Sequence, residues 1–317
     1  MTILFMEPLS RAWKRMKLAL FNPFDIHTWF VVGFNAFLAG LMDATSGAGG
    51  SRIQKNARFG EFIHFPRTAW DWLMSHPGWA IAILFAVVVG IAVVVVLTWA
   101  SSRGVFMFLD SVVHARAEIA KPWREYQKEG NSLFVWRILF GIVCIAMFTA
   151  LAAFFFIQAA ALYDGGLGRA LPIAFIVGLG LIFLALLLFC GYITLFLKDF
   201  VAALMYKHRI SAGAAWKLFL DVFKKYPFHF IGFGIITFLL MLVFVLAVIV
   251  AGLITCCIGW LVLIIPYIST VVTLPMWYAY RAFSLEFLAQ FGPEYNVFPV
   301  PASTETPAPA APTASVS

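Results

Sequence analysis

The sequence predicts an all-α integral membrane protein with six transmembrane helices, and its composition and apolar patterning carry that prediction. Of its 317 residues, 63% are hydrophobic and only 12% are charged, and the mean hydropathy is +0.94. Soluble domains carry about 25% charged residues. Long apolar stretches recur along the chain, so the lipid bilayer is expected to be its main solvent.

Six apolar stretches supply the predicted spans, because a helix of about 20 residues crosses the hydrocarbon core of a bilayer. In chain order the predicted spans are approximately 26–42, 78–100, 138–163, 171–197, 228–252 and 257–280. The last contains Pro266 and Pro275, which we expect to kink it because proline lacks a backbone N–H. Residues 1–298 are predicted to form one membrane domain, and the Pro-, Ala-, Ser- and Thr-rich segment 299–317 a disordered tail.

The distribution of basic residues predicts the orientation of these spans. Counted over alternate connecting segments, 17 of the 22 Lys and Arg residues fall on the side that holds both termini, and 5 fall on the other. Cytoplasmic segments are enriched in Lys and Arg, so both termini are predicted to be cytoplasmic, in a bacterial inner membrane. Anionic lipid headgroups are the expected partners of the +7 net charge, and nucleic acid is not expected.

Three segments that precede predicted spans each contain a Trp followed directly by a basic residue. In each segment a Phe or Pro-Phe follows about a dozen residues after the Trp. The pattern predicts amphipathic helices in the headgroup plane, each followed by a helical hairpin, and therefore a possible threefold repeat. In the first of them, Trp13, Met16, Leu20 and Phe21 are expected to share one face. The residues predicted to meet headgroups are Arg11, Trp13, Lys14, Arg15, Trp123, Arg124, Trp216 and Lys217.

Strongly polar residues are rare inside the predicted spans. Asp, Glu, Lys and Arg are missing from the central part of every span, which argues against a proton-coupled pump. Asn35 and Gln158 are the strong polar candidates that remain. We expect each to hydrogen-bond across helices as a structural contact; the alternative is that they contact a ligand in a membrane cavity.

Two acidic residues lie near the predicted cytoplasmic ends of spans. Asp110 and Asp199 each follow a Phe-rich run and precede a basic stretch. Helix capping, or pairing with the neighbouring basic residues, is the expected role. Two alternatives stay open: the carboxylates hold a cation or a headgroup amine, or Asp110, His114 and Asp199 converge as the acid–base residues of an enzyme acting on headgroups.

No catalytic residue, metal site or cofactor is predicted. The segment 43–77 contains acidic and His residues, but without the spacing of a metal site. Phosphate-binding loops, nucleophile elbows and zinc-protease motifs are missing from the sequence. The Cys residues lie in or beside apolar stretches without a zinc or redox spacing, so they are expected to pack as small hydrophobes. They are Cys144, Cys190, Cys256 and Cys257.

Two segments carry a resemblance to known proteins: 122–134, which opens with Pro122-Trp123-Arg124, and 281–295, which contains Gly292-Pro293. On these residues the chain resembles an uncharacterised group of bacterial polytopic membrane proteins, similar to the membrane domain attached to some glycerophosphoryl diester phosphodiesterases. The resemblance covers the chain to about residue 298 and implies a helical bundle with broad interfacial helices. It implies no phosphodiesterase activity, because the spans leave no room for a barrel of about 250 residues.

Together these features favour a non-enzymatic inner-membrane protein that binds or organises lipid. The alternative is a transporter or permease for a lipidic or small apolar solute, which predicts a cavity at membrane depth that touches Asn35 or Gln158. A headgroup enzyme is the least favoured of the three. The sequence leaves the ligand and the oligomeric state open.

Overall fold

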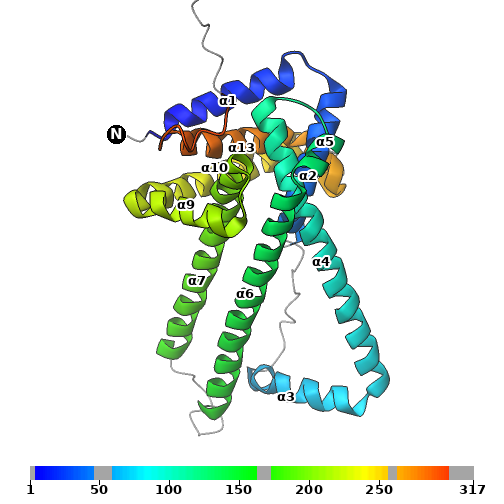
Figure 1. Cartoon of the computed structure of the whole chain (residues 1–317). Coiled ribbons are helices and arrows are strands. Elements are labelled where there is room, and N and C mark those ends of the chain that lie inside the picture. The colour runs from blue at the N-terminus through cyan, green and yellow to red at the C-terminus, as the bar shows by residue number, and fades with distance from the viewer. Residues whose placement is uncertain (1–3, 46–58, 163–172, 256–262, 300–317) are drawn as a thin grey trace, which may run out of the picture.

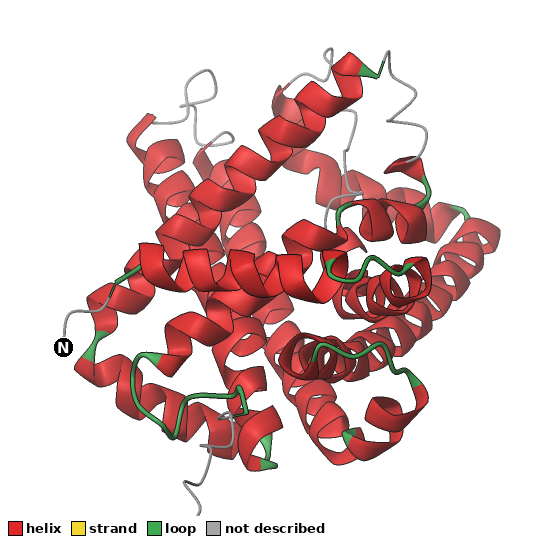
Figure 2. Ribbon diagram, turned by 90° about the horizontal axis from the view of Figure 1, so that it is seen from above, coloured by secondary structure: helices red, strands yellow, loops and turns green. Residues whose placement is uncertain are grey.

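The protein is helical throughout the part of the chain that the structure describes. The computed structural model describes residues 4–45, 59–162, 173–255 and 263–299, where it shows helices joined by turns and loops, and no strand (Figure 2). The all-α prediction is therefore confirmed for these ranges. The predicted disordered tail lies outside them, apart from residue 299.

Four helical stretches are long and apolar enough to cross a membrane. They are α4 (Pro77–His114), α6 (Gln127–Leu162), α7 (Ile173–Phe196) and α10 (Pro227–Ile254). The stretch that begins with α7 continues through the π-helical turn η2 (Leu197–Val201) into α8 (Ala202–His208). They coincide with the predicted spans 78–100, 138–163, 171–197 and 228–252. In Figure 1, α4, α6 and α7 extend downward from a layer of other helices.

The first and last predicted spans have a different form. Residues 26–42 lie in α2 (Ile26–Thr45), a shorter apolar helix. In the described part of the predicted span 257–280, two helices, α12 (Pro266–Val272) and α13 (Leu274–Ala289), meet at Thr273. Each begins with a proline in its first turn, where the missing N–H is harmless, whereas a proline in a helix interior clashes with the preceding turn.

Shorter helices cover the two ends of the long ones. α1 (Met6–Phe21), α9 (Ala212–Lys225) and α13 lie across the upper end in Figure 1, and α3 (Phe59–Ser75) lies across the lower end of α4. α5 (Ala120–Glu125) is also at the upper end. We call the upper layer the head: α1, α5, η2, α8, α9 and α13 with residues 98–114 of α4. The stalks are residues 77–97, 138–162 and 173–195.

An aromatic core holds the head together. Six fully buried Phe rings come from η2, α9, α10 and α13, with centroid separations such as 4.8 Å for Phe200–Phe233 and 4.9 Å for Phe233–Phe287. Ring pairs at these separations attract one another beyond the effect of burial alone. The six rings are those of Phe200, Phe219, Phe230, Phe233, Phe283 and Phe287.

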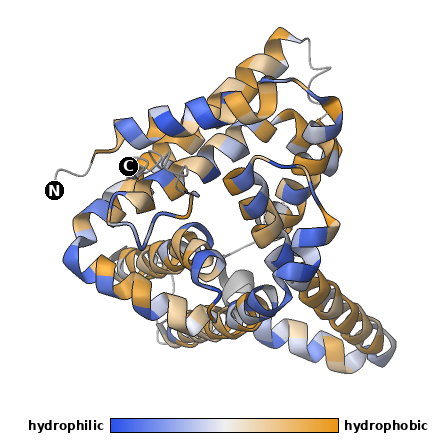
Figure 3. Cartoon of the chain, turned by 45° about the horizontal axis from the view of Figure 1, so that its top comes forward, coloured by the Kyte–Doolittle hydropathy of each residue, from blue (hydrophilic) through white to orange (hydrophobic). Residues whose placement is uncertain are grey.

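The helix α1 is amphipathic, and part of its predicted apolar face is buried against the protein. Ala12, Met16 and Leu20, spaced four residues apart, are buried on the side where α1 packs along α13. Trp13 and Phe21, which were predicted to share a face with Met16 and Leu20, remain 48% and 49% exposed. The alternation of hydrophilic and hydrophobic residues along α1 is visible in Figure 3.

The predicted entry helices differ in size. α1 has 16 residues and α9 has 14, but α5 between them has only 6. Pro122 lies inside α5, and the helix ends at Glu125 before α6 begins at Gln127. The second unit of the possible repeat therefore lacks an entry helix comparable to the other two.

Candidate functional site

A buried ion pair lies where α7 passes into α8. Asp199 is fully buried in the π-helical turn η2, and Arg281, on α13, is 3% exposed. Arg281 Nη1 donates to Asp199 Oδ1 at 3.1 Å and to the Lys198 carbonyl oxygen at 2.6 Å, and the Tyr280 hydroxyl also donates to the Asp199 carboxylate. Burial lowers the pKa of Arg281, while the Asp199 charge opposes that shift.

A cavity of about 460 Å³ adjoins this pair, between α2, α4, α10, α12 and α13. Its polar wall includes Lys198, Tyr280 and Arg281, and most of the rest is apolar. The apolar lining includes Phe37, Val105, Phe108, Met241 and Trp277. A volume of this size is typical of small-molecule sites, which combine an apolar wall with a few convergent polar groups.

One donor of the buried ion pair has no acceptor. Arg281 Nη2 is buried and makes no hydrogen bond within the part of the chain that the structure describes. The other terminal nitrogen, Nη1, is satisfied by two oxygens. A buried unsatisfied donor costs about 1–3 kcal/mol, and more for a charged group, so this one requires a reason.

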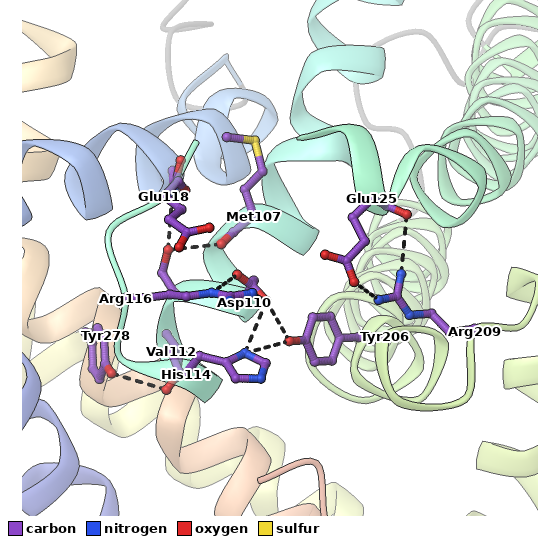
Figure 4. A network of polar contacts seen from close by, with 12 residues as sticks. Met107, Asp110, Val112, His114, Arg116, Glu118, Glu125, Tyr206, Arg209 and Tyr278 are labelled. Atoms are coloured by element: carbon purple, nitrogen blue, oxygen red, sulfur yellow. Dashed lines mark hydrogen bonds and ion pairs between the residues drawn. The ribbon is translucent and has the colours of Figure 1, made fainter. Parts of the chain in front are cut away.

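A second polar cluster surrounds Asp110, at the upper end of α4 (Figure 4). Arg116 Nε and Nη2 donate to the two Asp110 carboxylate oxygens at 2.9 and 3.0 Å, and the Tyr206 hydroxyl donates to Oδ1 at 2.9 Å. His114 Nδ1 lies 3.2 Å from Asp110 Oδ1. Ala115, at φ 51°, turns the chain so that Arg116 reaches back, and its hydrogen bonds to Asp110 raise the pKa of Arg116.

The two predicted acidic residues thus belong to separate clusters. Asp110 pairs with Arg116, six residues away, as expected for a neighbouring basic residue. Asp199 pairs with Arg281, 82 residues away, rather than with the basic stretch that follows it. Sequence reasoning missed Arg281, Tyr280 and Lys198. The signal that pointed to Arg281 is that it is the one basic residue of the C-terminal segment after the last predicted span.

The two predicted intramembrane polar residues have opposite environments. Asn35 is fully buried, and its Nδ2 donates to Ser111 Oγ at 3.0 Å and to the Glu118 carbonyl oxygen at 3.2 Å. These bonds join α2 to α4 and to the loop that follows it, as a structural contact would. Gln158 is exposed near the lower end of α6. Neither side chain lines the cavity beside Arg281.

The predicted headgroup residues also divide into two groups. Lys14, Arg124 and Lys217 are exposed on three different helices. Arg11 and Arg15 instead pair with Glu286 of α13, which is only 4% exposed.

The three Trp residues of this prediction have different surroundings. Trp123 lies edge-on to Trp99 at 5.7 Å, with the Arg103 guanidinium 5.1 Å from its centroid. Trp216 stacks on Trp136 at 5.3 Å. Both are half-buried, whereas Trp13 is half-exposed beside an apolar hollow of about 410 Å³ under α1.

The metal and cysteine predictions are addressed only in part. Among the described residues, no group of three or more His, Cys, Asp or Glu side chains is placed to hold a metal ion. Cys144 and Cys190 are free thiols with their Sγ atoms 3.4 Å apart, on α6 and α7. Cys256 and Cys257 lie outside the described residues.

Comparison with known proteins identifies a family but no activity. Residues 5–289 match the model of a family described as "Family of unknown function (DUF7544)". No curated protein and no solved structure matches the chain. The family match gives no link to the membrane domains of glycerophosphoryl diester phosphodiesterases, so that resemblance stays a prediction.

Proposed function

We propose that this chain, which belongs to the DUF7544 family, is a non-enzymatic membrane protein that binds and organises anionic lipid at one face of the bilayer. The observation that carries the proposal is the position of Lys14, Arg124 and Lys217. They are exposed side chains on α1, α5 and α9, three helices that lie at the same end of the apolar stalks (Figure 1).

The physical basis is electrostatic attraction beside a hydrophobic anchor. A basic residue near an anionic membrane surface contributes about 1 kcal/mol, so three of them at one level favour anionic over zwitterionic lipid by about 3 kcal/mol. Arg11 and Arg15 contribute less, because Glu286 neutralises part of their charge. The refined headgroup surface therefore consists of Lys14, Arg124 and Lys217.

The proposal places the head at the cytoplasmic face of a bacterial inner membrane, with both termini on that side, because cytoplasmic segments are rich in Lys and Arg. A six-span topology, with a first crossing at residues 26–42, is part of the proposal. A last crossing ahead of α12 and the threefold repeat stay predictions, and the shortness of α5 weighs against the repeat.

The test is lipid selection by the full chain in nanodiscs made from equal parts of phosphatidylglycerol and phosphatidylcholine. Lipids retained after gentle detergent release are counted by mass spectrometry. The triple variant Lys14→Gln, Arg124→Gln, Lys217→Gln is expected to lose most of the enrichment in phosphatidylglycerol, because its headgroup surface no longer carries positive charge.

Arg67 offers a matched control. It is exposed on α3, at the opposite end of the stalks, so Arg67→Gln is expected to change the enrichment little. Equal enrichment in the wild type and the triple variant would refute the proposal. A loss in Arg67→Gln as large as the average loss per charge in the triple variant would show that general charge, rather than this surface, is responsible.

A transporter or permease for a lipidic or small apolar solute is the second candidate, and the cavity beside Arg281 favours it. That cavity is lined by Ala36 and Phe37, which follow Asn35 in the chain, but not by Asn35 or Gln158. Movement of a labelled lipid between leaflets of vesicles containing the protein would support this candidate over a static binding role.

A headgroup enzyme has less support. Asp110 and His114 lie within 3.2 Å of each other, but Asp110 is neutralised by Arg116, and Asp199 is paired with Arg281 in another cluster. An acid–base mechanism needs its groups to reach one substrate, and the third member of the predicted set has its own buried partner.

A further inference from the structure

We propose that α3 is an interfacial helix that binds the headgroup boundary of the second leaflet, at the face of the bilayer opposite to the head. Its partner is the lipid surface itself, which α3 contacts through aromatic and apolar side chains. This inference goes beyond the proposed function, which concerns basic residues of the head, and it assigns a membrane contact to a helix that lies outside the predicted spans.

The polar side chains of α3 lie on the side of the helix that faces away from the protein. Arg67, Asp71 and Ser75 are exposed, and their four-residue spacing places them on one polar stripe. Ala69 and Leu73 are half-buried and fall on the opposite side, because successive residues of an α-helix are rotated by about 100°. α3 contacts both α4 and α6, so these two half-buried residues mark the side that faces the protein.

Large apolar side chains flank the polar stripe, and the described part of the chain leaves them uncovered. Phe65 and Trp70 are 61% and 59% exposed, and Trp72 and Met74 are exposed as well. An interfacial helix has this arrangement, with its polar side in water and its apolar side chains in the boundary between headgroups and acyl chains. Trp is enriched at that boundary because its ring combines an apolar body with a polar N–H.

The position of α3 along the stalks matches the edge of a hydrocarbon core. Trp79 and Trp99 of the continuous helix α4 are 20 residues apart, which corresponds to about 30 Å of α-helix and to the thickness of a bilayer core. Residues 80–98 between them contain no Asp, Glu, Lys or Arg, so the two Trp residues mark the two interfaces. α3 ends at Ser75 and α4 begins at Pro77, so α3 lies at the level of Trp79, across the lower end of α4 (Figure 1).

The contact at α3 does not depend on the charge of the lipid. Among the described side chains of α3, Arg67 and Asp71 are the charged ones, and their charges cancel. The headgroup surface of the head, by contrast, consists of three basic residues. Burial of apolar surface is insensitive to headgroup charge, so α3 binds phosphatidylcholine and phosphatidylglycerol membranes equally well.

The experiment compares the reactivity of one thiol beside the apolar flank with that of one thiol on the polar stripe. Phe65→Cys places the first and leaves Trp70 and Trp72 in position, and Ser75→Cys is the matched control on the stripe. Trp70→Cys, on the other flank, is a second probe. Each full-length variant is placed in phosphatidylcholine nanodiscs, one copy per disc, and treated with a water-soluble maleimide. Peptide mass spectrometry then gives the reaction rate at the substituted position, separately from the native Cys residues.

We expect Phe65→Cys and Trp70→Cys to react at least about 10-fold more slowly than Ser75→Cys, because a reagent dissolved in water does not reach a thiol below the headgroups. After denaturation in dodecyl sulfate all three variants are expected to react at similar rates, which shows that the difference comes from the bilayer. Nanodiscs made from equal parts of phosphatidylcholine and phosphatidylglycerol are expected to give the same ratio. A second copy of the chain cannot cause the protection, because each disc holds one copy.

Equal rates for the flank and stripe variants in nanodiscs overturn the proposal, because α3 would then lie in water. Slow reaction of Ser75→Cys as well overturns it, because the polar stripe would then be covered. Protection that requires phosphatidylglycerol overturns the charge-independent contact. The triple variant of the headgroup surface keeps the slow reaction of Phe65→Cys, so failure of the surface proposal and failure of this one give different results.

Discussion

The head and the stalks use apolar residues of the same kind in opposite ways, and α4 contains both within one helix. In its stalk part, Val88 and Ile91 are 56% and 59% exposed, whereas in its head part Phe106 and Leu109 are fully buried. No described residue covers Val88 and Ile91, and a hydrocarbon solvent makes such exposure favourable. The head instead packs its side chains against other helices, as a soluble domain does.

The comparison extends to polar groups. The head buries Asp110, Asp199 and Glu286, and each has an Arg partner. In the stalks, the strongest polar candidate, Gln158, is simply exposed. The difference teaches that the stability of the head depends on specific charge pairs and close side-chain contacts. The stability of the stalks depends instead on their apolar composition. The predictions below test that distinction, from the largest expected effect to the smallest.

Breaking the buried ion pair is expected to have the largest effect. Asp199→Ala leaves the Arg281 charge buried without its partner, which costs about 3–5 kcal/mol of folding stability. The measurement is thermal unfolding in detergent, followed by the fluorescence of the Trp residues. The double variant Asp199→Leu, Arg281→Leu is expected to be more stable than Asp199→Ala, because no unpaired charge remains. A single variant as stable as the wild type would show that the head does not depend on this pair.

Two glycines of α4 compare close packing in the head with open surface in the stalk. A Cβ at Gly104 would lie 2.6 Å from Leu38 Cβ and 2.7 Å from the Ala39 nitrogen, so α2 must move away. Gly104→Ala is therefore expected to destabilise the protein by about 1–3 kcal/mol. Gly90→Ala meets nothing within 4 Å and is expected to stabilise the helix by about 0.5–1 kcal/mol. The same unfolding assay measures both. Equal effects would contradict the difference between head and stalk.

Substitution of the two polar residues predicted inside the spans is expected to change stability the least. Asn35→Leu loses hydrogen bonds to Ser111 and to the Glu118 carbonyl oxygen, which leaves that carbonyl without this donor and costs about 1–3 kcal/mol. Gln158→Leu replaces an exposed amide with an apolar group and is expected to change stability by less than about 0.5 kcal/mol. Differential unfolding in detergent measures the two side by side, and a larger loss in Gln158→Leu would reverse the assignment of their roles.

Local sequence patterns predicted the long helices, but not how the helices near the two ends of the chain pack. The four predicted spans from 78 to 252 match helices, because each is one uninterrupted apolar run. Within the predicted span 257–280, where Pro266 and Pro275 were expected to kink the helix, α12 and α13 each begin with one of these prolines in the first turn. The sequence did not indicate that Met16 and Leu20 would be buried while Trp13 stays 48% exposed, because burial depends on which side of α1 a neighbouring helix covers.

The candidate site could be predicted only in fragments. Asp199 was identified as an unusual acidic residue, but its partner lies 82 residues away on a different helix. Lys198, Arg281 and Gly40 have no shared pattern in the sequence, and they line one cavity because α2, η2 and α13 meet there. Arg15 was predicted to meet headgroups because it lies on the basic side of an amphipathic segment, whereas its partner Glu286 is 271 residues away.

The sequence by itself determined that this chain is helical and suited to a membrane. In hydrocarbon every backbone polar group must be satisfied within its own segment, so an apolar run of sufficient length forms a helix whatever surrounds it. Only the tertiary structure decided which charges are paired, which basic residues remain exposed and where a cavity lies. Those properties depend on contacts between residues far apart in the chain, and no local pattern specifies such contacts.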